Sequence, residues 1–273
     1  MPRYIALDLE TVPDEDLVFA VDGEPGRSYG EQVQRLLAAR KAQSGGRSDF
    51  LPLPYHRPVA ACTVEATEDA GALLVTGIGC WTDRNRDEAD FLTRFWKQLR
   101  GRTLVSFHGR GFDLPVLELR SLKLGVSAPS WFKNGRQAAP EEHQDLFELL
   151  SNSGAAPAAP LDLYAKLVGL PGKEGVAGKD VRALYADGEI DRIAAYCLTD
   201  VVQTWLLYLR FRLLEGSLTP AAYQRSLRSS REALPALFAE RLGGGVWKLL
   251  DGFLDRCAPF FEDGSPAPMR RAL

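Results

Sequence analysis

The sequence predicts an α/β fold in which a mixed β-sheet is flanked by helices and followed by further helices toward the C-terminus. Short alternating or continuous apolar segments within the first 110 residues indicate strands. Apolar residues at the 3.6-residue spacing of amphipathic helices recur between and after them, most clearly over residues 189–214. With 273 residues, 45% of them hydrophobic and 25% charged, the chain can build one substantial domain with a helical appendage.

The first expected strand, residues 4–11, reads Tyr-Ile-Ala-Leu-Asp-Leu-Glu-Thr. Because side chains alternate along a strand, Asp8 and Glu10 share one face, roughly 7 Å apart. Two carboxylates among apolar neighbours are costly unless a cation neutralises them. The pair alone also fits an edge strand whose polar face meets water, so more distant residues must decide between these interpretations.

Three more strands are expected in the N-terminal part of the chain. Residues 59–65 and 73–81 flank a polar turn and should form an antiparallel meander with the first strand. A helix that begins near Asp87 separates them from a buried fourth strand at residues 103–107. A glycine-rich turn then leads into a helix over residues 112–124.

Residues 143–150 should form a short strand or begin a helix, and the rest of the chain should be helical. The later helices share periodic apolar residues and are expected over residues 161–168, 181–185, 189–214, 220–242 and 246–257. Pro235 should break the fourth of these helices. We therefore expect a catalytic domain over residues 1–214 and a helical extension over residues 215–273, whose tail from Pro259 should fray.

An insertion is expected directly after the first strand, over residues 14–58. It contains glycine, proline and serine clusters around one helix at residues 29–43. Long irregular segments beside a candidate site often act as lids or contact the substrate.

Composition argues against several classes of protein. Four cysteines lie far apart without a C-x-x-C pair, and only three histidines occur, so disulfide frameworks and zinc or imidazole-rich sites are not expected. We find no secretory leader and no apolar run of about 18 residues, so we expect a cytoplasmic protein without a membrane partner. The net charge of −3 carries no nucleic-acid signature. Residues 94–136 are locally basic and fit either a phosphate-attracting surface or an ordinary solvated one.

Three later residues favour a functional interpretation of the Asp8–Glu10 pair. Asp113 starts the helix after the fourth strand, from where it can reach across the end of the sheet. Tyr196 and Asp200 are four residues apart on a helix and share one face. The resulting order is D-x-E on the first strand, aspartate after the fourth strand, and Y-x-x-x-D on a late helix.

This ordered set resembles the DEDD superfamily of 3′-5′ exonucleases, in the subgroup whose last motif carries tyrosine (DEDDy). The segments that resemble its motifs are residues 8–11 (DLET), 107–115 (FHGRGFDLP) and 196–201 (YCLTDV). The chain is also similar to a bacterial stand-alone family related to the proofreading domain of family-B DNA polymerases. The segments shared with that family include residues 143–146 (HQDL) and 170–173 (LPGK).

The resemblance covers residues 3–214 and implies a ribonuclease-H-like fold. It implies a phosphodiester hydrolase that removes nucleotides from the 3′ end of single-stranded nucleic acid, with DNA favoured as substrate. Two alternatives stay open: an exoribonuclease that trims RNA, and a nucleic-acid-binding module that has lost catalysis. The presence of all four acids and Tyr196 speaks against the second.

Converging carboxylates repel one another by about 4 kcal/mol per pair at 4 Å and an effective dielectric constant of 20. Divalent cations relieve this repulsion, and oxygen ligands suit Mg²⁺ or Mn²⁺; two such ions can activate a water and stabilise the leaving oxygen. By resemblance, Asp8 would bridge both ions, and Glu10 and Asp200 would hold the ion beside the nucleophile. Asp113 would hold the other ion through water, and Tyr196 would orient the attacking water.

Five further residues are candidate substrate contacts: Thr11, His108, Arg110, Phe112 and Lys173. Thr11 contacts the terminal nucleotide or merely ends its strand. His108, which replaces a common asparagine, contacts substrate or caps the turn, and we favour the structural role. Phe112 stacks on a terminal base or joins the core. Lys173 reaches a phosphate or stays in a solvated loop. Asp145 should fix the fold near the site.

Overall fold

A five-stranded mixed sheet organises the part of the chain that the computed structural model describes, residues 1–273 except 85–86, 137–141, 174–177, 251 and 264–273. The order is β3-β2-β1-β4-β5; β1 pairs antiparallel with β2 and parallel with β4, β2 antiparallel with β3, and β4 parallel with β5. The strands are β1 (Arg3–Pro13), β2 (His56–Asp69), β3 (Ala72–Thr82), β4 (Thr103–Ser106) and β5 (His143–Asp145). The expected α/β class, with a ribonuclease-H-like sheet flanked by helices, is confirmed.

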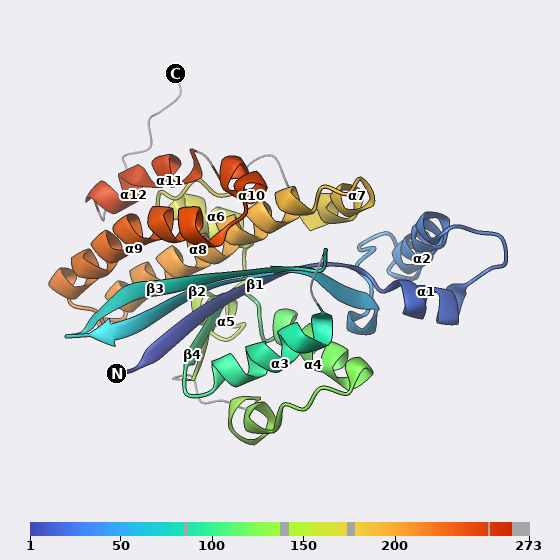
Figure 1. The fold of residues 1–273 in the computed structure, drawn as a ribbon, viewed down its shortest axis with the longest axis horizontal. Helices are drawn as coiled ribbons and strands as arrows, with labels where there is room; N and C mark the ends of the chain where they lie inside the picture. Colours follow the sequence, from blue (N-terminus) through green and yellow to red (C-terminus); the bar gives the residue numbers. More distant parts are fainter. Residues whose placement is uncertain (85–86, 137–141, 174–177, 251, 264–273) are drawn as a thin grey trace.

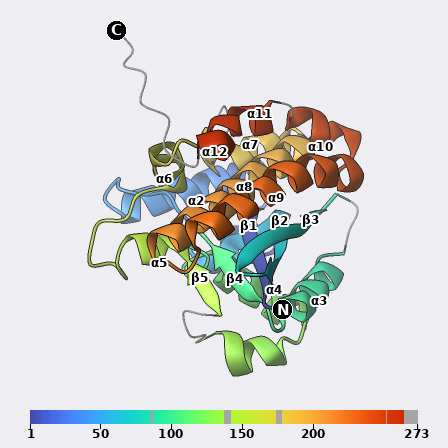
Figure 2. The ribbon, with the colours of Figure 1, turned by 90° about the vertical axis from the view of Figure 1, so that its left-hand side faces the viewer.

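Helices cover both faces of this sheet (Figure 1). One layer contains α3 (Glu88–Leu99) and α4 (Asp113–Leu124), and the opposite layer is dominated by α8 (Ile190–Leu214) and α9 (Pro220–Arg241). Figure 2 shows the sheet end-on between these two layers. The remaining helices are α1 (Glu15–Asp22), α2 (Tyr29–Gln43), α5 (Leu146–Leu150), α6 (Leu161–Leu167), α7 (Val181–Ala186), α10 (Gly244–Leu249), α11 (Phe253–Arg256) and α12 (Ala258–Asp263), with short turns at Leu53–Tyr55, Trp131–Gly135 and Gly178–Asp180.

Because side chains alternate along β1, the strand contributes to two hydrophobic cores, one on each face of the sheet. Ile5, Leu7 and Leu9 pack with α3 and α4, whereas Tyr4 and Ala6 belong to the core under α8 and α9. Since β1 lies between β2 and β4, the interpretation of its carboxylates as part of a water-facing edge strand is wrong. The pairing of β1 with β2 shifts register between Glu10 and Thr11, at the point where the strand leaves the candidate site.

The helix α9 covers β3, which is an edge strand of the sheet. The hydroxyls of Ser226 and Ser229 accept hydrogen bonds from the N–H groups of Leu73 (2.8 Å) and Val75 (3.0 Å). Edge-strand amides that find such partners are not available for pairing with another chain. The helix α9, which belongs to the expected C-terminal extension, therefore covers the edge of the sheet at β3.

Three details of the C-terminal part differ from the sequence-based expectation. Pro235 does not break α9, because the buried Leu234 and Phe238 hold the helix against its neighbours on both sides of the proline. The helix expected over residues 246–257 is instead α10 and α11, and Gly252 precedes α11 in a left-handed conformation (φ 75°) that ends regular helix. The tail is helical as far as Asp263, and its remainder lies outside the described residues.

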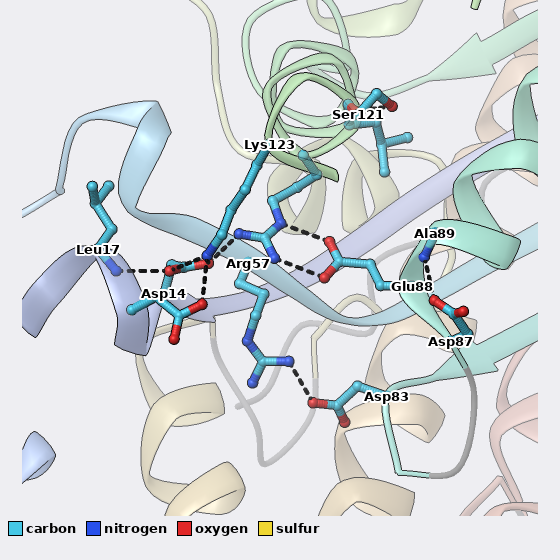
Figure 3. A network of polar contacts seen from close by, with 12 residues as sticks. Asp14, Leu17, Arg57, Asp83, Asp87, Glu88, Ala89, Ser121 and Lys123 are labelled. Carbon is cyan, nitrogen blue, oxygen red and sulfur yellow. Dashed lines mark hydrogen bonds and ion pairs between the residues drawn. The ribbon is translucent and has the colours of Figure 1, made fainter. Parts of the chain in front are cut away.

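The insertion contains the expected α2 and an additional helix, α1, which the sequence analysis missed. Asp14 caps α1 by accepting from the Leu17 N–H at 2.9 Å. Asp14 also binds Lys123 and Arg120 of α4, and Arg120 in turn makes two hydrogen bonds to Glu88 at 2.6 and 2.7 Å (Figure 3). This buried ion network attaches the start of the insertion to α3 and α4.

Among the described helices, none combines the length and the apolar character that a membrane span needs.

Candidate active site

Three carboxylates converge where the central strand passes beneath α8. Asp8 and Glu10 come from β1 and Asp200 comes from α8, and each offers a carboxylate oxygen within 4.8 Å of the others. Glu10 and Asp200 are buried, whereas Asp8 is partly exposed. The fold therefore brings Asp200 into one cluster with two acids that lie about 190 residues earlier in the chain.

Asp113 stands beside this cluster, at the N-terminus of α4. Its buried carboxylate accepts hydrogen bonds from its own N–H and from the Leu9 N–H, which tie α4 to β1. Its ligand atoms are not part of the compact group formed by the other three acids. Gly109, in the turn before α4, permits that turn to pack closely on β4, since a Cβ there would collide with Ser106.

The cluster carries an excess of negative charge in a buried setting. Burial, followed by repulsion from the neighbouring acids, raises the pKa of both Asp8 and Glu10 well above the ordinary value. Burial also raises the pKa of Asp200, although Lys173 opposes this, and it raises the pKa of Asp113 to about 7. Three such carboxyl groups in one cluster, with a fourth beside it, favour either protonation or a bound cation.

Two oxygen atoms of the cluster are candidate ligands for a cation. Within the described part of the chain, Asp8 Oδ2 and Asp200 Oδ1 are buried and have no hydrogen-bond partner. Buried polar atoms are normally satisfied, so these two atoms point to a ligand. An all-carboxylate donor set suits a hard divalent ion such as Mg²⁺ or Mn²⁺.

Lys173 supplies positive charge inside the site. Its Nζ lies 2.8 Å from Asp200 Oδ2, donates a hydrogen bond to the Tyr196 hydroxyl, and lies 4.8 Å from the centre of the Tyr196 ring. Asp200 and nearby Asp8 raise the pKa of Lys173 despite burial, which acts to lower it, so the ammonium remains charged at neutral pH. The structure thus places Lys173 against the acids rather than in a solvated loop.

The backbone before Lys173 is held in place by α6 and α8. The Gly172 N–H donates to Gln203 at 2.7 Å, and the Lys173 N–H donates to Asp162 at 2.6 Å. Gly172 has a left-handed conformation (φ 75°), and a Cβ there would collide with Asp162 and Lys166. The glycine of the L-P-G-K segment is therefore required to present Lys173 to the site.

Tyr196 lies one helical turn before Asp200 on α8, as its spacing predicts. Its hydroxyl hydrogen-bonds the Asp200 carboxylate. Burial and the surrounding carboxylates raise the pKa of Tyr196 above the ordinary value, so this hydroxyl stays protonated. Cys197, the next residue, donates a hydrogen bond to the Asp8 carbonyl at 3.2 Å and joins α8 to β1 within the site.

The turn of the second motif is built on Asp145. Its two carboxylate oxygens accept from the N–H groups of His108 (2.7 Å) and Arg110 (2.8 Å), which confirms that Asp145 fixes this loop. The Arg110 side chain binds the His143 carbonyl at 2.9 Å and Glu148 at 3.1 Å, so it braces β5 and α5. The ring of His108 packs on Phe147 while its backbone adopts a left-handed conformation (φ 66°). These contacts favour structural roles for Arg110 and His108 over the expected substrate contacts.

Thr11 and Phe112 meet two residues that the sequence analysis did not select. Thr11 Oγ1 lies 2.9 Å from His56 Nδ1, and the His56 ring makes an edge contact with Phe112, 5.0 Å between centres. Phe50 stacks on His56 at 4.9 Å. The only sequence signal for these two residues is their place near the end of the insertion: Phe50 shortly precedes the strand that pairs with β1, and His56 begins that strand.

Comparison with known proteins assigns the chain to a family. Residues 48–242, more than half of the chain, match the family described as predicted 3′-5′ exonucleases related to the exonuclease domain of PolB. The chain belongs to this family. The matched range contains Asp113, Lys173, Tyr196 and Asp200 but begins after β1. The assignment of Asp8 and Glu10 to the candidate active site therefore rests on their position beside Asp200 in the structure.

Curated relatives include DNA polymerases of archaea. The chain is 28% identical to the enzyme of Pyrococcus glycovorans over 149 residues and 26% identical to that of Thermococcus gorgonarius over 176 residues. These matches cover 48% and 57% of this chain but only 19% and 23% of the polymerases, so the chain spans about a fifth of their length. A solved family-B polymerase of Pyrobaculum calidifontis aligns with a TM-score of 0.47 and 17% identity, over 96% of this chain and 29% of that polymerase.

Proposed function

We propose that this protein is a metal-dependent 3′-5′ exonuclease that hydrolyses phosphodiester bonds at the 3′ end of single-stranded nucleic acid, with DNA as the favoured substrate. The observation that carries this proposal is the cluster of Asp8, Glu10 and Asp200, in which two buried carboxylate oxygens have no hydrogen-bond partner among the described residues. Family membership and the relatives' identity as DNA polymerases support the reaction and the substrate class.

The acids have a shared role in this proposal. Asp8, Glu10 and Asp200 would hold two Mg²⁺ or Mn²⁺ ions together with Asp113, and the ions would supply an activated water and charge stabilisation for the leaving oxygen. Because the site otherwise concentrates negative charge, the phosphate of a nucleic acid cannot approach it without such cations.

Tyr196 and Lys173 contribute a proton donor and a fixed positive charge. A tyrosine that stays protonated can donate a hydrogen bond and orient the attacking water, but it is a poor base. Lys173, charged and partly exposed, would contact a phosphate oxygen once Asp200 has another cationic partner.

The test of this function compares single-stranded DNA and RNA of one sequence. Each is labelled at its 3′ end and, in a parallel set, at its 5′ end, and incubated with Mn²⁺, Mg²⁺ or EDTA. We expect metal-dependent loss of the 3′ label and a ladder of shortened 5′-labelled products, faster on DNA. Faster loss from RNA would identify an exoribonuclease, and no metal-dependent degradation of either strand would overturn the proposal.

Replacing Tyr196 with phenylalanine should lower kcat by about a hundredfold or less while leaving residual activity, because the hydroxyl positions the water without holding a metal. The substitution keeps the ring that packs beneath Lys173. Single-turnover degradation of 3′-labelled DNA measures the effect, and the melting temperature verifies the fold. Complete loss of activity would assign Tyr196 a greater role than orientation.

Replacing Lys173 with methionine should weaken DNA binding and reduce its dependence on salt. Each phosphate contact on a single strand contributes about 0.7 to the slope of log affinity against log salt, so the slope should fall by about that amount. Fluorescence anisotropy of a labelled oligonucleotide over a range of salt concentrations measures the slope. Lys97 offers a control, since it is exposed on α3, in the helix layer on the opposite side of the sheet from α8; Lys97→Met should leave the slope unchanged.

A further inference from the structure

A small cavity lies beside Tyr196 and is bounded by α8 and by the C-terminal helices α10 and α11. Its volume is about 130 Å³, and Tyr196 forms part of its wall. Gly172, which presents Lys173 to the acids, lines the same cavity. The cavity therefore adjoins the candidate active site, although α10 and α11 begin after residue 242, where the match to the exonuclease family ends.

The C-terminal helices pack against α8 (Figure 1). Val246, Leu250 and Phe253 are buried in the same hydrophobic core as the apolar residues of α8. Gly245 permits this close contact, since a Cβ there would collide with the carboxylate of Asp191 on α8. Packing against α8 therefore fixes this wall of the cavity relative to the acids.

Two arginines line the cavity from different helices. Arg192 belongs to α8 and Arg256 to α11, and both side chains are exposed. A Cβ at Gly252 would come within 2.9 Å of Arg256 Nη1, so this guanidinium group lies against the start of α11. Among the described residues, Arg192 has no ion-pair partner and no carboxylate lines the cavity. The cavity is therefore a positively charged site.

The size and the charge of the cavity fit a phosphate group. Pockets for drug-sized ligands occupy about 300–1,000 Å³, so a cavity of about 130 Å³ has no room for a whole nucleotide. Arginine binds phosphate oxygens through paired N–H donors, and such charge-assisted hydrogen bonds are stronger than neutral ones. Since the wall includes Tyr196, a phosphate bound here would belong to the strand whose end lies at the acids.

We propose that Arg192 and Arg256 bind a backbone phosphate of the substrate strand on the 5′ side of the scissile bond. This proposal rests on the proposed function and gives the C-terminal helices a part in substrate binding. The nucleotide removed by a 3′-5′ exonuclease carries no phosphate beyond the scissile one, so any further phosphate site serves the 5′ side. Proteins that bind single strands place basic groups along the path of the backbone. Lys173 and the two arginines would form such a path.

The first experiment measures the binding of labelled single-stranded DNA by fluorescence anisotropy. Ca²⁺ replaces Mg²⁺, under conditions where a gel shows that the strand stays intact. Arg192→Met and Arg256→Met should each weaken binding about tenfold and lower the slope of log affinity against log salt by up to about 0.7. Arg94, exposed on α3 in the opposite helix layer, is the control: Arg94→Met should change neither quantity. Melting temperatures verify that each variant is folded.

The second experiment locates the contact on the strand. One phosphate at a time is replaced by an uncharged methylphosphonate. At one position near the 3′ end this replacement should weaken wild-type binding about tenfold, but it should affect the variant with both arginines replaced by less than about twofold. Equal sensitivity of wild type and this variant at every position would overturn the phosphate site alone. Absence of metal-dependent degradation by wild type would instead overturn the proposed function.

Discussion

Replacing Asp8 with alanine should lower exonuclease activity by about a thousandfold or more. A metal-held transition state gains several kcal/mol of charge stabilisation, and each 1.36 kcal/mol corresponds to a factor of ten in rate. Asp8 lies at the centre of the effect because both Glu10 and Asp200 act on its carboxyl group, and because its Oδ2 is buried without a partner among the described residues. Degradation of 3′-labelled DNA under single-turnover conditions measures the loss. Full Mg²⁺-dependent activity in Asp8→Ala would contradict the mechanism.

The matched variant Asp8→Asn separates metal binding from folding. Without metal, it should be more stable than wild type, because it removes one of the repelling buried charges. Mn²⁺ at about 100 times its dissociation constant should raise the melting temperature of wild type by about 5 °C, and that of Asp8→Asn by much less. Thermal unfolding with Mn²⁺ and with EDTA provides both comparisons.

The direction of the pH dependence follows from the same repulsion. The folded pKa values of these acids are raised above the unfolded values near 4, so the folded chain binds more protons than the unfolded chain. Stability of the metal-free protein should therefore fall as pH rises from about 4 to about 7, where Asp113 ionises. Saturating Mn²⁺ should reverse this trend, because the metal binds the ionised form.

Much of the fold could be predicted because its signals are local. The alternation in β1 and the Asp87 cap of α3 each act within a few residues. The expected break of α9 at Pro235 was wrong because non-local packing decides the outcome. A proline inside a helix removes a local hydrogen bond, but the packing of the buried Leu234 and Phe238 against distant parts of the chain compensates for that loss. Asp14 was not recognised as a helix cap, and α1 was missed with it.

The candidate site likewise contains residues that the sequence predicts and residues that it does not. The order of the motifs selected the acids and Tyr196, and the structure brings Asp8, Glu10 and Asp200 together. His56 could not be found from order or spacing, since it depends on the pairing of Pro13 with His56 at the start of β2. That pairing joins the end of the insertion to the strand that carries Glu10, a long-range contact without a local signature.

Replacing Arg120 with alanine should lower the free energy of unfolding by about 3–5 kcal/mol, and the melting temperature by about 10 °C. The Arg120 side chain is 5% exposed and binds both Asp14 and Glu88, so its loss leaves two carboxylates with little access to water. Burial acts to raise the pKa of Asp14, but Lys123, the Leu17 N–H and Arg120 outweigh it and lower the pKa. The stabilisation by Asp14 is therefore present above about pH 4 and disappears as pH falls through the lowered folded pKa.

Lys123→Ala is the control for this prediction, because Lys123 binds the same carboxylate but is 37% exposed. It should cost about 1 kcal/mol or less. Adding Asp14→Asn and Glu88→Gln to Arg120→Ala should restore part of the stability, since the cost arises from unpaired buried charge. Urea unfolding at pH 7 and pH 4 gives each free energy, and the difference between Arg120→Ala and wild type should narrow at pH 4. Equal losses from Arg120→Ala and Lys123→Ala would show that the buried network does not anchor the insertion to α3 and α4.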